Sequence, residues 1–224
     1  MRPVLSIPTL GRPHLRECVE SIDIDCRLLI IANGGEDWDW LPDHAWLLQP
    51  PGNLGVACSW NLTIKSYPLE DYWLIANDDV VFAPGDLARL VESEGYGWVG
   101  IDDWRAFKLT AETVARVGFF DEGYHPIYGE DADYEKRCDI AGVRWGFIQG
   151  ETSHVGSACL QHHRHDNGRT YPRNVQRYRD KWGVGQIRQP GGHRSPFDRG
   201  GSVADDTQAD LSTLRANVWR DADD

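Results

Sequence analysis

Two adjacent carboxylates interrupt an apolar stretch of the sequence. Residues 72–82 read YWLIANDDVVF, so Asn77, Asp78 and Asp79 lie between two apolar runs. An ionised carboxylate resists leaving water unless a cation or hydrogen-bond donors compensate it. Carboxylate oxygens suit Mg²⁺ and Mn²⁺, which leave coordination positions free for phosphate oxygens. The stretch therefore predicts either a divalent cation site or a solvent-facing turn rich in Asp.

A second acidic group, Glu130-Asp131-Ala132-Asp133, begins a predicted helix over 130–142. Acids in the first turn of a helix interact favourably with its dipole, by about 0.3–1 kcal/mol each, and this alone could explain them. Three acids in four residues, after a glycine- and aromatic-containing loop, exceed what a cap requires. Like charges so close raise at least one carboxyl pKa, which suits a general base.

Histidines form the third set of candidates. His154 follows a predicted strand, and beside a carboxylate-bound metal it would supply a nitrogen ligand, although a lone histidine is more often structural. His162, His163 and His165 lie close together without a cysteine at zinc spacing, which favours surface-exposed side chains.

These residues need elements that bring them together, and the sequence alternates short apolar runs with helical patterns. Strands are predicted over 3–8, 27–33, 72–76, 97–101, 104–109 and 143–148, and helices over 12–22, 54–67, 85–93, 110–118, 130–142 and 173–183. The alternation predicts an α/β domain with a largely parallel sheet. Ligands of such sheets bind beyond the carboxyl ends of the strands. Pro8-Thr9, Asn33 and Asn77 each end a predicted strand, so we expect them at one edge.

Length and charge limit the alternatives. The 224 residues fit one domain, expected over 1–189, with a polar tail of doubtful order over 190–224. A net charge of −12 argues against indiscriminate nucleic-acid binding. Basic residues gather in 162–194, which would either face a phosphate-bearing ligand or form a solvated helix face. The ten Trp and eight Tyr would line stacking sites for sugars or bases, or fill the core.

Cysteine usage and hydropathy bear on the compartment. The five Cys form no CxxC pair, which favours a reduced cytosolic protein. The chain shows no signal-peptide pattern, and no apolar run approaches transmembrane length. We therefore expect a soluble, cytoplasmic protein without a transmembrane segment. The preference for Arg over Lys indicates a GC-rich coding source, such as an actinobacterium or a phage.

In their order, these motifs resemble the family 2 glycosyltransferases, inverting nucleotide-sugar enzymes with the GT-A fold. VLSIPTLGRP and LLIIANGG are similar to the first two strands, GNLGVACSWN to the segment that shapes the nucleotide pocket, and IANDDVVFAP to the strand with the metal-binding D-x-D element. VGFFDEGYHPIYGEDADYEKR resembles the acceptor loop with its ED motif, and HVGS the later His segment. The resemblance covers residues 3 to about 183. It implies an α/β, Rossmann-like, three-layer α/β/α domain with a largely parallel mixed sheet.

The resemblance also implies roles for individual residues. Asp79 and His154 would bind the divalent cation, Mn²⁺ or Mg²⁺. Asp131 would be the general base that deprotonates the acceptor hydroxyl, and Glu130 would position acceptor or sugar. The expected contacts to the nucleotide sugar are Pro8, Thr9, Arg12, Asn33, Gly55, Asn61, Asn77 and Asp78. Asn77 replaces the first acid of the usual triplet, which implies weaker metal affinity.

The expected donor is a UDP- or dTDP-sugar. The segment between Asp79 and Glu130 is short for the family, so we expect an open site for a macromolecular acceptor: a protein, a glycan, a lipid-linked sugar or a modified nucleic acid. Two other functions stay open. A nucleotidyltransferase would need a Gly- and Lys-rich loop where this chain has PTLGRPH. A nucleotide-sugar-binding module without turnover is compatible with Asn77, but it would have no use for the Glu130-Asp131 pair.

Overall fold

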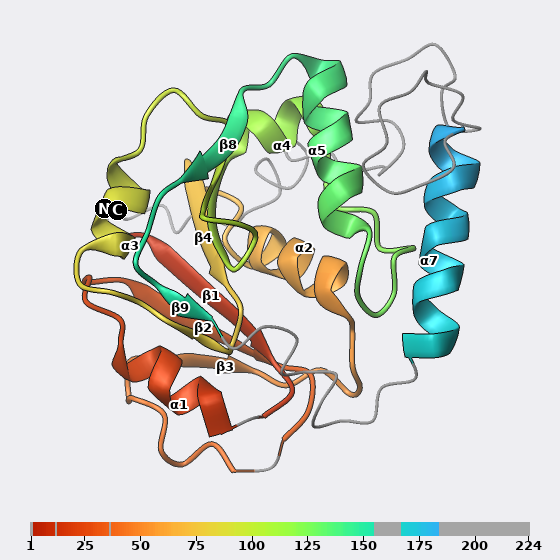
Figure 1. Cartoon of the computed structure of the whole chain (residues 1–224). Coiled ribbons are helices and arrows are strands. Elements are labelled where there is room, and N and C mark those ends of the chain that lie inside the picture. The colour runs from red at the N-terminus through yellow and green to blue at the C-terminus, as the bar shows by residue number, and fades with distance from the viewer. Residues whose placement is uncertain (1, 12, 36, 155–166, 184–224) are drawn as a thin grey trace, which may run out of the picture.

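A mixed, mostly parallel β-sheet forms the centre of the domain (Figure 1). The computed structural model describes residues 2–11, 13–35, 37–154 and 167–183. Within them, seven strands pair in the order β3-β2-β1-β4-β7-β6-β8. These strands are β1 (Val4–Thr9), β2 (Arg27–Ala32), β3 (Trp46–Leu48), β4 (Tyr72–Ala76), β6 (Trp98–Ile101), β7 (Ala106–Thr110) and β8 (Trp145–Ile148). Only β7 runs antiparallel to its neighbours, β4 and β6, in this sheet.

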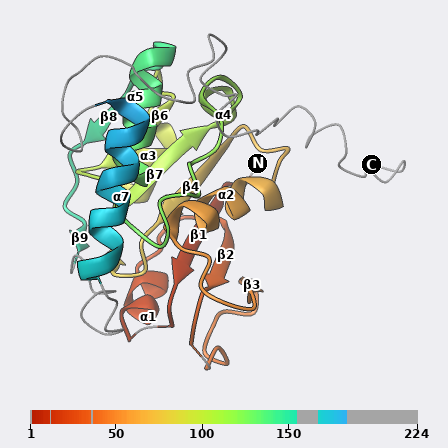
Figure 2. The same cartoon turned by 90° about the vertical axis from the view of Figure 1, so that its right-hand side faces the viewer.

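Helices cover both faces of the sheet, which confirms the expected α/β architecture (Figure 2). They are α1 (Pro13–Glu20), α2 (Val56–Ser66), α3 (Asp86–Glu92), α4 (Ala111–Val117), α5 (Glu130–Ala141) and α7 (Asn167–Trp182). Successive strand residues point to opposite faces. Leu5 and Ile7 of β1 therefore join the core beneath α1 and α3, and Val4 joins the core beneath α2, α4 and α5. None of the helices described here is long and apolar enough to cross a membrane.

Some elements differ from those predicted. The strands β3, β5 (Val80–Val81) and β9 (Ser153–His154) were missed because two or three residues show no periodicity. Helix α7 begins at Asn167, whereas the sequence predicted a start at residue 173. The prediction was wrong because proline is typical of the first turn of a helix, but Pro172 lies in the interior of α7. Arg12, the three clustered histidines and the segment 190–224 lie outside the described residues.

The order of the strands reverses between β1 and β4. The chain proceeds from β1 to β2 and β3 on one side, and then places β4 on the other side of β1. Strand β1 pairs with β2 as far as Thr9, whereas its pairing with β4 ends at Ser6. The strands therefore part beyond Ser6, and ligands of open α/β sheets bind at such a reversal.

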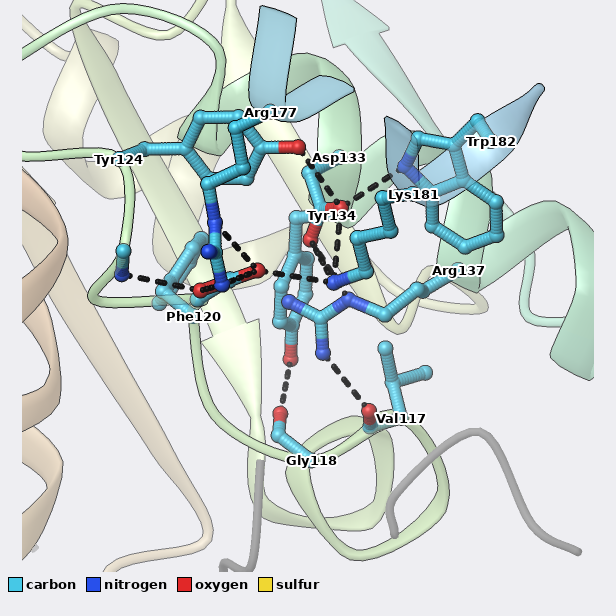
Figure 3. A network of polar contacts seen from close by, with 12 residues as sticks. Val117, Gly118, Phe120, Tyr124, Asp133, Tyr134, Arg137, Arg177, Lys181 and Trp182 are labelled. Atoms are coloured by element: carbon cyan, nitrogen blue, oxygen red, sulfur yellow. Dashed lines mark hydrogen bonds and ion pairs between the residues drawn. The ribbon is translucent and has the colours of Figure 1, made fainter. Parts of the chain in front are cut away.

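A buried network of charges joins α5 to α7 (Figure 3). Asp133 is fully buried and accepts hydrogen bonds from Arg137 Nε and Trp182 Nε1, both at 2.9 Å. Lys181 Nζ lies 3.0 Å from Asp133 and 3.0 Å from Asp121. Burial acts to raise the pKa of Asp121, but Lys181 and Arg177 outweigh it and lower that pKa to about 2. The acids of this network therefore fix α7 on the domain.

We expect Asp133→Asn to lower the free energy of unfolding by about 3–5 kcal/mol, because it removes one member of a buried ion pair and leaves the cations undercompensated. Urea denaturation measures the loss. The matched control is Asp180→Asn on the exposed face of α7, which should change stability by no more than about 0.5 kcal/mol. Equal stabilities of the two variants would contradict the role assigned to Asp133.

Candidate functional site

A cavity of about 370 Å³ lies beyond the carboxyl ends of β1 and β4. It brings together seven of the predicted site residues: Pro8, Asn77, Asp78, Asp79, Glu130, Asp131 and His154. Its wall also contains residues that the sequence analysis missed: Val56, Trp60, Asp103, Trp104, Arg105, Ile127 and Tyr128. The two acidic groups, more than 50 residues apart in sequence, thus share one cavity.

Asp78 is fixed by the end of the neighbouring strand. Its side chain is 3% exposed, and Thr9 Oγ1 donates a 2.6 Å hydrogen bond to its Oδ2. The same Thr9 oxygen accepts a hydrogen bond of 3.0 Å from the backbone of Gly11. Thr9 therefore orients Asp78 and does not itself line the cavity.

Asp79 and His154 lie side by side because two short strands pair. Strand β5 begins directly after Asp79, and its Val80 pairs with His154 of β9. His154 Nε2 is 2.9 Å from Asp79 Oδ1, without the alignment of a hydrogen bond. Neighbouring ligands of an octahedral Mg²⁺ with bonds of 2.0–2.1 Å are about 3 Å apart. The spacing fits two ligands of one cation.

The described residues place no group of three or more His, Cys, Asp or Glu side chains around a common point. Asp79 and His154 could therefore hold a cation only if water or a bound molecule supplied its remaining ligands. Such partial coordination is usual for Mg²⁺ bound together with substrate phosphates.

Glu130 and Asp131 begin α5 on the other side of the cavity. Glu130 is 4% exposed, and backbone N–H groups of Glu130 and Tyr128 hydrogen-bond to its carboxyl group. Its Oε2 has no hydrogen-bond partner among the described residues. Burial, and then the charge of Asp131, raise the pKa of Glu130 well above its ordinary value. Asp131 is less buried than Glu130 and lines the same cavity.

Arg105 contributes a cationic side chain to the cavity wall. Its Nε and Nη2 donate to the two oxygens of Asp103, at 3.0 and 2.9 Å, and its Nη1 donates to the Thr152 carbonyl at 3.0 Å. The Arg105 carbonyl accepts a 2.8 Å hydrogen bond from the Asn77 backbone, which places it beside the acidic turn. The signal in the sequence was Asp102-Asp103, a second pair of acids between two apolar runs.

Two residues predicted to contact the nucleotide, Asn33 and Asn61, instead hold elements around the cavity. Asn33 donates to Ser59 Oγ at 2.8 Å and accepts from the Leu54 backbone at 3.0 Å, which ties the end of β2 to the start of α2. Asn61 is buried, and its amide both donates to and accepts from the Phe120 backbone, each at 2.9 Å. Neither lines the cavity, so direct nucleotide contacts by these residues stay predictions.

Gly55 has a structural reason to be glycine. Its φ is 78°, and a Cβ there would lie 2.8 Å from the Pro126 carbonyl oxygen. The next residue, Val56, donates a backbone hydrogen bond of 2.7 Å to that oxygen. Gly55 thus lets the start of α2 contact the loop over 118–129, which leads into the acidic pair.

Comparisons with known proteins support a glycosyltransferase fold. No family model matches the sequence. A galactofuranosyl glycosyltransferase of Leishmania donovani is 42% identical over 60 residues, which make up 26% of this chain and 14% of that protein. The structure of S. aureus TarS matches with a TM-score of 0.52 at 11% identity, over 66% of this chain and 35% of that one.

Another solved structure, a mutant of Drosophila β1,4-galactosyltransferase 7 in complex with manganese, UDP-Gal and xylobiose, has a TM-score of 0.48 at 10% identity, over 71% of this chain and 74% of that one. The likeness to TarS shows that the chain shares its fold, in agreement with the expected GT-A-like architecture, and 60 residues of its sequence are similar to a glycosyltransferase.

The raised pKa of Glu130 predicts a stability that depends on pH. Above the ordinary glutamate pKa of about 4.3, the unfolded chain loses this proton readily, whereas the folded protein retains it. In this pH range the folded state binds more protons than the unfolded state. The contribution of Glu130 to the free energy of unfolding therefore falls as pH rises, until the pH exceeds the pKa of Glu130 in the folded protein. We expect Glu130→Gln to match the wild type near the ordinary pKa and to become relatively more stable toward alkaline pH, measured by urea denaturation.

The control for this experiment is Glu112→Gln on α4, whose side chain is 80% exposed. Its stability relative to the wild type should show no comparable trend with pH. A Glu130→Gln variant whose stability parallels that of the wild type across the whole range would contradict the prediction.

Proposed function

We propose that the protein transfers a sugar from a nucleoside-diphosphate sugar, UDP- or dTDP-linked, to an acceptor hydroxyl. The observation that carries the proposal is the placement of two potential metal ligands, 2.9 Å apart, in the same cavity as an acidic pair at a helix start. The local sequence similarity to a galactofuranosyl glycosyltransferase supports the same reaction class.

The donor side consists of Asp78, Asp79 and His154. Asp79 and His154 would hold Mn²⁺ or Mg²⁺, and the bound cation would neutralise the negative charge of the departing diphosphate. Arg105 lines the same cavity as an ion pair with Asp103 and would offer guanidinium N–H donors to the diphosphate. Its two hydrogen bonds to Asp103 hold the guanidinium in a fixed orientation, so it need not reorganise when the diphosphate leaves.

The acceptor side consists of Glu130 and Asp131. The Asp131 carboxylate takes the proton of the acceptor hydroxyl, and the oxygen of that hydroxyl attacks the anomeric carbon. The bond from this carbon to the diphosphate breaks, and its electron pair leaves with the diphosphate, so a single displacement inverts the anomeric configuration. Glu130, kept protonated by burial, has a proton with which to hydrogen-bond an oxygen of sugar or acceptor.

A macromolecular acceptor completes the proposal. The chain between Asp79 and Glu130 is used for β5, α3, β6, β7 and α4, which leaves the loop over 118–129 to shape the acceptor side. Loops on a rigid scaffold commonly supply such specificity.

Thermal unfolding with nucleoside diphosphates and nucleotide sugars, with and without Mn²⁺, tests the donor site. A ligand that binds the native state at 100 times its Kd stabilises it by about 2.7 kcal/mol. We expect a Mn²⁺-dependent stabilisation by uridine or thymidine diphosphates that Asp79→Ala abolishes. The control is Asp71→Asn, an exposed acid just before β4, at the far end of that strand from the cavity. Absence of stabilisation by every nucleotide would contradict the proposal.

Catalysis is separated from binding by Asp131→Asn. This variant should bind nucleotide with Mn²⁺ as the wild type does, because Asp131 is not a metal ligand in the proposal. Its transfer rate should fall by about 10²–10⁴-fold, the usual contribution of a general base, in a product-release assay. Unchanged turnover would assign the base to another residue.

A further inference from the structure

Tyr128, in the cavity wall, has a backbone conformation that requires support. Its φ is 79°, in the left-handed region that residues other than glycine rarely adopt. Gly129 follows with φ of 101°, and Glu130 begins α5. Such strained residues persist where the surrounding structure holds them, and they gather at functional sites.

Asn174 of α7 supplies this support. Its side chain is fully buried, and its Nδ2 donates to the Ile127 carbonyl at 2.8 Å and to the Tyr128 carbonyl at 3.0 Å. An amide nitrogen has two hydrogens, so both are used on consecutive carbonyls. The neighbouring Arg173 donates to the His125 carbonyl. Two consecutive residues of α7 thus donate hydrogen bonds to three carbonyls of the loop.

The backbone of Tyr128, which Asn174 holds, lies next to the acidic pair Glu130-Asp131. The N–H of Tyr128 hydrogen-bonds to the Glu130 carboxyl group, while the carbonyl of Tyr128 is bound by Asn174. A change in the Tyr128 backbone would therefore move both a cavity side chain and a hydrogen bond to Glu130. The donor side is held separately, by Thr9 and by the pairing of β5 with β9.

Helix α7 is anchored independently of Asn174. Two turns further along, Lys181 and Trp182 contact Asp133, and Arg177 binds Asp121 with its Nη2 2.6 Å from Oδ1 (Figure 3). Removing the Asn174 amide therefore leaves the main attachment of α7 in place.

We infer that Asn174 is a positioning residue for sugar transfer, acting through the Tyr128 backbone on the acceptor side of the cavity; the inference rests on the proposed function. Asn174 touches no reacting group. It determines the positions of Tyr128, Glu130 and Asp131 relative to the nucleotide-sugar donor, which other residues bind.

The test is Asn174→Ala in the full chain, with Gln176→Ala on the exposed face of α7 as the matched control. In the ligand-free protein, amide hydrogen exchange over 124–131 should become about ten-fold faster in Asn174→Ala and stay unchanged in the control. The Kd for nucleoside diphosphate with Mn²⁺ should stay within about two-fold of the wild-type value, whereas kcat should fall by about 100-fold, as expected for a misplaced catalytic group.

A second background distinguishes positioning from general destabilisation. Glycine adopts the Tyr128 conformation without strain. In Tyr128→Gly, the added change Asn174→Ala should therefore accelerate exchange of the loop much less than it does in the wild type. If Asn174→Ala does not fold, Asn174→Ser, which keeps one donor, replaces it in both backgrounds.

Three results would overturn the inference. The first is unchanged hydrogen exchange of the loop in Asn174→Ala, and the second is equal acceleration of exchange in the wild-type and Tyr128→Gly backgrounds. The third is accelerated exchange with an unchanged kcat. Because the exchange is measured without ligand, it decides the role of Asn174 in holding the loop even if no nucleotide binds. Failure of nucleotide binding in the wild type would instead overturn the proposed function.

Discussion

Burial of carboxyl groups is the constraint on which this structure depends. Asp78, Asp79 and Glu130 are each less than 5% exposed, and a buried carboxyl group needs compensating partners or, like Glu130, has its pKa raised. Asp133 shows what full compensation looks like: it shares the first turn of α5 with Glu130, but Arg137, Lys181 and Trp182 surround it. Glu130 lines the cavity instead, and its Oε2 has no hydrogen-bond partner among the described residues. This contrast distinguishes an acid that stabilises the fold from acids that line the cavity.

The two sides of the cavity are built by different means. Asp78 and Asp79 follow a strand within a hydrogen-bonded sheet, so backbone pairing sets their position. The loop over 118–129 contains no strand, and its Phe120 and Ile127 carbonyls accept hydrogen bonds from the side chains of Asn61 in α2 and Asn174 in α7. In the proposed function, the sheet would fix the donor side and the contacts of the loop would fix the acceptor side, which suits a fold in which acceptor specificity varies with loop sequence.

The sequence predicted the parts of the site that follow from strand order. Apolar runs that end in Pro8 and Asn77 predict parallel strands, whose carboxyl ends meet at one edge, and both residues line the cavity. His154 reaches Asp79 through two strands of two residues each, too short for any periodicity to show their pairing. Arg105 precedes an antiparallel strand whose place in the sheet depends on tertiary packing. The inward-facing amide of Asn61 likewise depends on a partner 59 residues away.

The many tryptophans serve both as core and as cavity wall. Trp98 of β6 contacts Trp104 with ring centroids 3.9 Å apart, and Trp104 stacks on Trp60 of α2 at 5.6 Å. Trp104 also donates its Nε1 hydrogen to Glu135 of α5 at 2.7 Å, and both Trp60 and Trp104 line the cavity. Because Trp104 directly precedes Arg105, this packing fixes the turn that carries the guanidinium. The apolar core thus determines where the Arg105 guanidinium lies in the cavity wall.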